Sequence, residues 1–255
     1  MKKVLVSIFA LAMVLSWSLP AAGQASSSLN DQLIQAATNG DTAAVQQLLN
    51  KGADIEAKDA YGETALFEAA RNGNTEVVTL LLNKGANIEA KDTYGETALY
   101  EAARKGNTEV VKLLLDKGAN IETTNGVLNS TALIMAAGVG KVEVVNLLLA
   151  RGANIEARDN QGKTALIEAI DSQDSTVESV TVLLEKGANI EARDNKGKTS
   201  LMWAAIRGRT AIVNVLLAKG ASIDAKSNNG GTALWWANYM GTPDMVNLLR
   251  SKGAH

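Results

Sequence analysis

The sequence contains no cysteine, one histidine and two prolines among its 255 residues. Without cysteine the chain offers no disulfide, no thiol nucleophile and no lipoprotein anchoring residue. The one histidine is the final residue, His255, so a Ser–His pair and the usual zinc sites are also excluded. We therefore expect no catalytic residues, no metal and no cofactor, and an enzyme is the least supported class of function.

Long apolar runs are scarce, and the one that occurs spans residues 4–19. Two lysines precede it and small residues follow it, which is the three-part pattern of a secretory signal peptide. It is shorter than the roughly 20 residues of a spanning helix, so an uncleaved anchor is the less favoured alternative. We expect residues 1–25 to be removed after Gly23 or Ala25, leaving no membrane span. The expected destination is the periplasm of a Gram-negative bacterium, with secretion as the alternative.

Basic residues do not outnumber acidic residues in this chain. The formal net charge is −2, and removal of Lys2 and Lys3 with the signal peptide changes it to −4. A nucleic-acid partner requires a basic face, so this mild acidity argues against nucleic acid as a partner.

What the sequence does contain is a repeat. Residues 63–95 read ETALFEAARNGNTEVVTLLLNKGANIEAKDTYG, and the same pattern starts again at Glu96. Self-similarity at a fixed period of this size indicates stacked supersecondary units that bury a shared core. After a short polar leader at 26–30, we expect one domain over 31–255 with seven copies. They fall near 31–62, 63–95, 96–129, 130–162, 163–197, 198–230 and 231–255.

One unit predicts two short helices and an extended connection. Thr64 suits the N-cap of a helix whose apolar face continues to Ala70, and Gly73 ends that helix. Asn74 with the following threonine suits the N-cap of a second helix, over about residues 75–84. The connection then runs extended and turns at Gly95. In the first copy we expect Asp31 to take the place of the capping threonine.

This unit resembles the ankyrin repeat, whose marks are a turn, two helices, a 33-residue period and a T-P-L-H-x-A helix start. The resemblance covers about 31–255 and implies an all-α repeat solenoid, a helix-turn-helix stack with short hairpin connections. The motif's proline is alanine or serine here, and its histidine is replaced by apolar packing residues. These are Phe67, Tyr100, Ile134, Ile167, Met202 and Trp235. The resemblance also implies protein partners held by the turn tips and the inner helices.

The ends and two irregular copies depart from the common unit. Polar Gln47 in the first copy and Arg250 in the last replace leucines or valines, which predicts that both ends are capped and the array is complete. One extra residue near Val127 and two near Asp174 break the period. Solenoid insertions often lie on the binding face, but tolerated drift in a surface loop is an equal alternative.

An acidic residue recurs once per copy. With copies roughly 10 Å apart, these carboxylates are too far from one another to share a metal ion. We expect a solvated structural ladder interleaved with lysine and arginine. Its members are Glu56, Glu89, Glu122, Glu156, Glu191 and Asp224.

The candidate partner-binding residues are those that differ between copies on the exposed side of the first helix. Early copies are charged there, and Glu68 could pair with Arg71; late copies are aromatic. Trp203 and Trp236 give the sharpest signal, since Trp, Tyr and Arg are enriched at interface centres. Their alternative role is to cap the stack, as we expect Trp235 to do. The full predicted set is Trp203, Ile206, Arg207, Trp236, Tyr239, Met240, Met135, Tyr61 and Tyr94.

Together these features predict a non-catalytic protein–protein interaction module, monomeric and exported. Its unidentified partner protein would bind the concave face and turn tips and be protected or inhibited. The alternative is a glycan or peptide receptor that uses the surface of Trp203 and Trp236.

Overall fold

A computed structural model describes residues 27–255. The predicted signal peptide and both cleavage sites lie outside the described residues. Within them the chain forms fourteen helices arranged as seven pairs. The pairs are α1 (Leu29–Asn39) with α2 (Thr42–Asn50), α3 (Ala65–Arg71) with α4 (Thr75–Asn83), α5 (Ala98–Lys105) with α6 (Thr108–Asp116), α7 (Ala132–Gly138) with α8 (Val142–Ala150), α9 (Ala165–Asp171) with α10 (Val177–Glu185), α11 (Ser200–Ile206) with α12 (Thr210–Ala218), and α13 (Ala233–Tyr239) with α14 (Pro243–Ser251).

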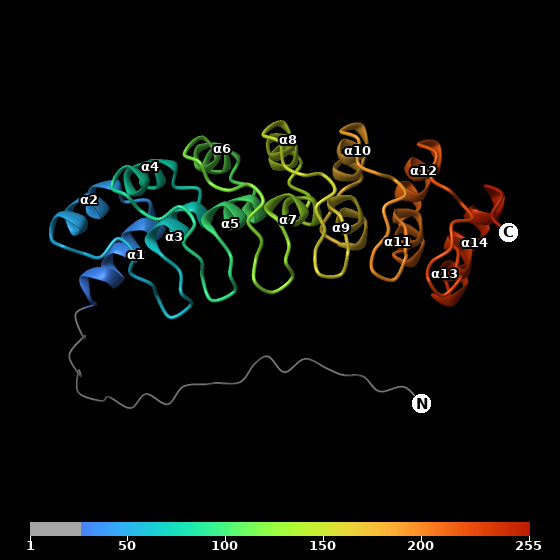
Figure 1. The fold of residues 1–255 in the computed structure, drawn as a ribbon, viewed down its shortest axis with the longest axis horizontal. Coiled ribbons are helices and arrows are strands. Elements are labelled where there is room, and N and C mark those ends of the chain that lie inside the picture. The colour runs from blue at the N-terminus through green and yellow to red at the C-terminus, as the bar shows by residue number, and fades with distance from the viewer. Residues whose placement is uncertain (1–26) are drawn as a thin grey trace, which may run out of the picture.

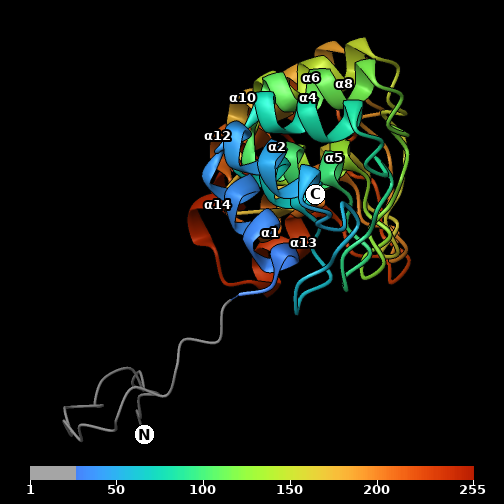
Figure 2. The ribbon, with the colours of Figure 1, turned by 90° about the vertical axis from the view of Figure 1, so that its left-hand side faces the viewer.

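The pairs stack into a curved solenoid, as predicted (Figure 1). The second helices α2 to α12 follow the convex edge, and the loops between pairs project from the opposite side as hairpins. Figure 2 shows the hairpins of successive pairs gathered on one side of the stack. Four isolated antiparallel bridges, such as Lys58 with Thr64, close hairpins. The first helices and the hairpins line the concave side of the stack, which is called the groove below (Figure 1). No helix among residues 27–255 is long and apolar enough to cross a membrane.

The threonine caps of the first helices form as the repeat predicts in five copies, whereas Thr199 at the start of α11 makes no side-chain cap. Thr64 Oγ1 accepts a hydrogen bond of 3.2 Å from the backbone N–H of Phe67, and Thr97, Thr131, Thr164 and Thr232 cap their helices in the same way. The predicted cap of the first copy was wrong. Ser28 is the N-cap of α1, and Asp31 completes a capping box by accepting from the Ser28 N–H. The helix therefore begins inside the segment predicted as leader.

The core is a continuous layer of small and branched residues between pairs. Leu66, Ala69, Val77 and Leu81 are 0–2% exposed, and the alanines let neighbouring first helices pack closely. The residues replacing the motif histidine are buried in copies two to six. Apolar packing there is confirmed with one addition, because the Tyr100 hydroxyl also accepts from Asn125 Nδ2 at 3.2 Å.

The acidic ladder is structural, in a more specific form than predicted. Five of its six carboxylates, all except Asp224, accept a hydrogen bond of 2.7 Å from a backbone N–H of the next repeat. The pairs are Glu56 with Asn87, Glu89 with Asn120, Glu122 with Asn154, Glu156 with Asn189, and Glu191 with Ser222. A parallel set of basic side chains donates to carbonyls of the next repeat. Its members are Lys58, Lys91, Arg158 and Arg193.

Neighbouring pairs are also linked at the turns between their helices. Asn74 makes no side-chain cap; its Nδ2 instead donates to the carbonyls of Ala37 and Thr38, at 2.8 and 3.0 Å. Arg209 takes the same place four repeats later. Its guanidinium donates to Ser172 O and Ser175 O, both at 2.5 Å, and so ties down the loop with the insertion near Asp174.

The last pair leaves aromatic surface open. Trp235 was predicted to pack over the end of the stack, and this was wrong in part. Its ring stacks on Tyr239 with centroids 5.3 Å apart, yet 44% of its surface stays exposed. At the insertion in the third copy, Val127 stands at a hairpin tip with 58% of its surface exposed.

Candidate interaction surface

The charged half of the concave groove is paired within itself. Glu68 and Glu101 were predicted to be exposed, and this was wrong, because they are 7% and 1% exposed. Arg71 reaches three carboxylates: Glu63, Glu68 Oε1 at 2.5 Å, and Glu101 Oε1 at 3.0 Å. The predicted pairing of Glu68 with Arg71 is thus confirmed. Arg104 adds a second contact to Glu101 at 2.6 Å.

Burial changes the acidity of this cluster. Desolvation, followed by the hydrogen bond to Glu63, raises the pKa of Glu68 to about 7, although Arg71 opposes the shift. Oxygens of Asp59, Glu63 and Glu68 lie within 4.8 Å of one another, a spacing that could suit a cation. Arg71 already supplies the positive charge there. Asp59 Oδ1 also accepts from the N–H groups of Tyr61 and Glu63. The arrangement is an ion-pair cluster in which Arg71 bridges Glu63, Glu68 and Glu101.

A pocket of about 240 Å³ opens in the middle of the groove, between α7 and α9. Predicted residue Met135 lines it, and Gly138 occupies the position that holds Arg71 and Arg104 in earlier copies. A Cβ at Gly138 would stand 3.1 Å from Glu168 Cγ, closer than an ordinary contact, so a larger side chain here would crowd this part of the pocket. The rest of the apolar lining is Leu128, Ile134 and Val139.

Lys163 forms the charged wall of this central pocket. Its Nζ lies 2.5 Å from Asp171 Oδ2 and 3.0 Å from Glu168 Oε2. Burial lowers the pKa of Lys163, but these hydrogen bonds outweigh it and hold the pKa above its usual value. Arg207, another predicted residue, pairs with Asp171 at 2.6 Å.

The predicted tryptophans flank a lysine. Lys198 Nζ lies 4.3 Å from the ring centroids of both Trp203 and Trp236, a cation–π arrangement. The Trp203 indole N–H donates to Asp194 Oδ2 at 3.1 Å. Both tryptophan side chains are partly buried. The ammonium group of Lys198 lies over the ring of each. The sequence prediction did not include Lys198; the residue before the capping threonine varies between copies, but its pairing partners are seen only in the structure.

The remaining predicted residues fall in separate places. Tyr61 and Tyr94 are exposed at neighbouring hairpin tips, 62% and 56% respectively. Tyr239 and Met240 are exposed at the end of the stack. Ile206 is half-buried on α11. The structure thus brings Trp203 and Trp236 together, and it distributes the others along the groove from the second copy to the last.

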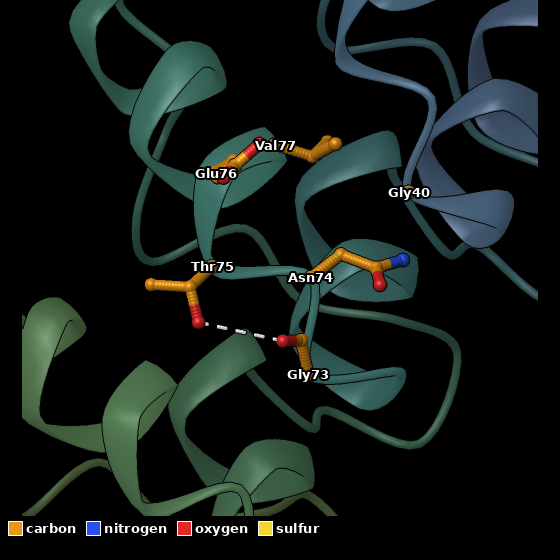
Figure 3. Close-up of a pocket in the computed structure, with 6 residues that line it drawn as sticks. All are labelled: Gly40, Gly73, Asn74, Thr75, Glu76 and Val77. Carbon is orange, nitrogen blue, oxygen red and sulfur yellow. Dashed lines mark hydrogen bonds between the residues drawn. The ribbon is translucent and has the colours of Figure 1, made fainter.

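A further hollow, of about 310 Å³, lies at the turns between helices, where Gly40 meets the start of α4. Figure 3 shows the Asn74 side chain extending toward Gly40. Its amide is already committed to the carbonyls of the preceding repeat. Thr75 Oγ1 bonds Gly73 O at 3.4 Å. The polar groups of this hollow therefore serve the stack itself.

Comparison with known proteins agrees with this architecture. Residues 33–125, 123–194 and 175–255 each match the family described as ankyrin repeats (3 copies). The chain is an ankyrin repeat protein. Ankyrin repeat domains are generally protein–protein interaction modules.

Similar proteins include bacterial and human members. Two ankyrin repeat proteins of Rickettsia felis are 53% identical over 38 residues, which is 15% of this chain. The match spans about three fifths of those relatives, 60% and 58%. The ankyrin repeat domain of human ASB11 is 26% identical with a TM-score of 0.77, over 88% of this chain and 98% of that one. The ankyrin repeat domain of Bcl-3, a member of the IkappaB protein family, is 31% identical with a TM-score of 0.74, over 86% and 97%.

Proposed function

We propose that this ankyrin repeat protein is a non-catalytic, monomeric interaction protein of the bacterial periplasm. It holds a partner protein in the concave groove and along the hairpin tips, and it protects or inhibits that partner. Because the groove is preformed, binding costs little ordering of the receptor.

The observation that carries the proposal is the central pocket. The glutamates of the ladder, its basic side chains and the Arg71 cluster have partners within the stack. At Met135 and Gly138 the repeat pattern gives way to an apolar hollow beside Lys163. An apolar pocket with a few polar groups at its wall is the usual form of an anchor site for a partner side chain.

Photo-crosslinking tests this proposal. A photoreactive phenylalanine is placed at Tyr94 on the groove side and, as a matched control, at Lys112 on the outward side of α6. After irradiation in cells, Tyr94 should give discrete protein adducts and Lys112 should not. Gly138→Arg, which fills the central pocket, should reduce the adducts at Tyr94 at least fivefold. Equal adducts at both positions, or none at Tyr94, would contradict groove binding.

Export rests on the pattern within residues 1–25. Amino-terminal sequencing of the protein recovered from a periplasmic fraction should start at Gln24 or Ser26. An intact Met1, or protein confined to the cytoplasm, would contradict export without affecting groove binding.

The glycan-receptor alternative is supported less well. A stacking platform needs free ring faces, and Lys198 lies over Trp203 and Trp236. A sugar would have to displace this cation or use the opposite faces.

A further inference from the structure

One buried cation in the groove has no anionic partner. Lys198 is 8% exposed, yet its Nζ makes no hydrogen bond and no ion pair within 4.0 Å among the described residues. Both tryptophan rings offer it only their faces. Burial lowers the pKa of Lys198 below its usual value, as expected for an ammonium that has lost water without gaining an acceptor.

Comparison along the stack explains why this cation is alone. The residue before the capping threonine pairs with the residue eight positions later in two other copies: Glu63 with Arg71, and Lys163 with Asp171. In the sixth copy the residue eight positions after Lys198 is Ile206. Compared with the fifth copy, the sixth copy keeps the lysine but has an isoleucine in place of the aspartate that would pair with it.

The carboxylate of Asp194, on the same hairpin, is engaged elsewhere. Asp194 Oδ1 accepts from the backbone N–H groups of Lys196 and Lys198, each at 2.8 Å. Its Oδ2 accepts from the Trp203 indole N–H at 3.1 Å. Asp194 therefore holds the hairpin and orients the indole, and it leaves Lys198 Nζ free.

Lys198 lines a pocket of about 290 Å³ at the tips of the last two hairpins, together with Asn195, Lys196, Asn228, Asn229 and Trp236. No acidic residue lines it. Besides the two ammonium groups, Asn229 Nδ2 is a donor without an acceptor in the described structure, since only its Oδ1 is bonded, to Ser227 and Gly231. The pocket thus offers two positive charges, spare donors and an indole wall.

From this geometry we infer that the pocket around Lys198, the tip pocket, binds a carboxylate, contributed by an acidic side chain of the partner protein. The inference rests on the proposed function in taking the partner to be a protein. The backbone N–H groups of Asn195 and Asn228 are already bonded to carbonyls of neighbouring hairpins. The pocket therefore lacks the converging amides that suit a phosphate dianion. A carboxylate on an aliphatic arm matches the ammonium and the apolar indole together.

The tryptophans provide the readout. The full chain is titrated with N-acetyl-glutamate α-amide while tryptophan fluorescence is recorded, and N-acetyl-glutamine α-amide serves as the neutral twin. We expect a saturable change with the acid, at a Kd on the order of millimolar for one partly screened ion pair, and none with the amide. Screening by added salt should weaken the binding.

Three variants locate the site. Lys198→Met keeps an apolar chain between the indoles and should weaken binding at least tenfold. Asn229→Asp keeps the oxygen that accepts from Ser227 and Gly231 but adds a negative charge, and should also weaken it at least tenfold. Lys219→Met, an exposed lysine on the outer side, should bind like the parent. Circular dichroism melts confirm folding; if Lys198→Met does not fold, Asn229→Asp decides.

Four results would overturn the inference: no saturable change up to about 50 mM acid, an equal response to the neutral amide, unchanged affinity in the folded variants, or saturation by inorganic phosphate without saturation by the acid. These outcomes are separate from the proposed function. Crosslinks at Tyr94 can persist when the titration fails, and the titration can succeed when no partner is crosslinked.

Discussion

Glu89 Oε1 accepts a hydrogen bond of 2.7 Å from the backbone N–H of Asn120, one repeat further along the chain. The same carboxylate accepts from Thr123 Oγ1 through Oε2 at 3.0 Å. The Glu89 side chain, which the sequence predicts to be solvated, thus links the connecting segments of two successive repeats. Since each repeat contacts only its neighbours, such a bond contributes directly to the coupling between repeats.

Loss of the hydrogen bonds that Glu89 accepts should destabilise the stack. Glu89→Ala removes both acceptors, and we expect the free energy of unfolding to fall by about 1–2 kcal/mol. This lies at the lower end of the range for hydrogen bonds to a charged group, because the site is half-buried. Guanidinium unfolding followed by circular dichroism measures it. Asp224→Ala is the matched control, because Asp224 has the same place in its copy and accepts from no following repeat. Equal losses in both variants would contradict the coupling role of the ladder.

The buried Glu101 should matter more than its position on a groove suggests. It is 1% exposed and contacts both Arg71 and Arg104. Glu101→Ala should cost about 2–3 kcal/mol, since two charge-assisted contacts are lost from a buried acceptor. Denaturant unfolding again provides the measurement. Glu109→Ala, an exposed glutamate on α6, should stay within about 0.5 kcal/mol of the parent; a similarly small effect for Glu101→Ala would show that the cluster contributes little.

The raised pKa of Glu68 predicts a pH dependence. The folded state binds this proton more tightly than the unfolded state, with a pKa of about 7 against the usual 4.5. The resulting stability is fully present below pH 4.5 and is lost as the pH rises through about 7. Glu68→Gln removes this titration, so the difference in unfolding midpoint between parent and variant should change between pH 5 and pH 8. A constant difference over that range would place the titration elsewhere.

Much of the fold follows from the sequence because it is set by local signals repeated seven times. Thr64 and its equivalents, the glycines and the leucines each act within one unit, and comparison of copies averages out the exceptions. The first copy shows the limit. Asp31 occupies the place of a capping threonine, but Ser28, three residues earlier, is the N-cap and forms a capping box with Asp31. Comparison with the other copies could not predict this, because their first helices begin at the threonine.

Less of the candidate surface than of the fold could be predicted from the sequence. Glu68 and Glu101 face the groove, yet their burial depends on arginines of the same and the neighbouring repeat. Helical periodicity within one repeat cannot show such contacts. Trp203 was identified from its place on the first helix and from its residue type. The feature that distinguishes its surroundings, the unpaired Lys198, becomes visible only when the pairing of Glu63 with Arg71 and Lys163 with Asp171 is known.

The hairpin at Gly95 should tolerate substitution least among the turns. Its φ is +76°, and an added Cβ would stand 2.5 Å from the backbone nitrogen of Gly126, which donates to Tyr94 O at 2.8 Å. Gly95→Ala therefore combines a left-handed backbone with a clash against neighbouring backbone. We expect a loss above about 2 kcal/mol in denaturant unfolding. Gly85→Ala is the control: φ is +90° there, but nothing lies within 4 Å of the new Cβ. Its loss should be near 1 kcal/mol from backbone strain alone. If the two variants unfold at the same midpoint, the close approach of the two hairpins is not the cause, and backbone conformation alone sets the cost.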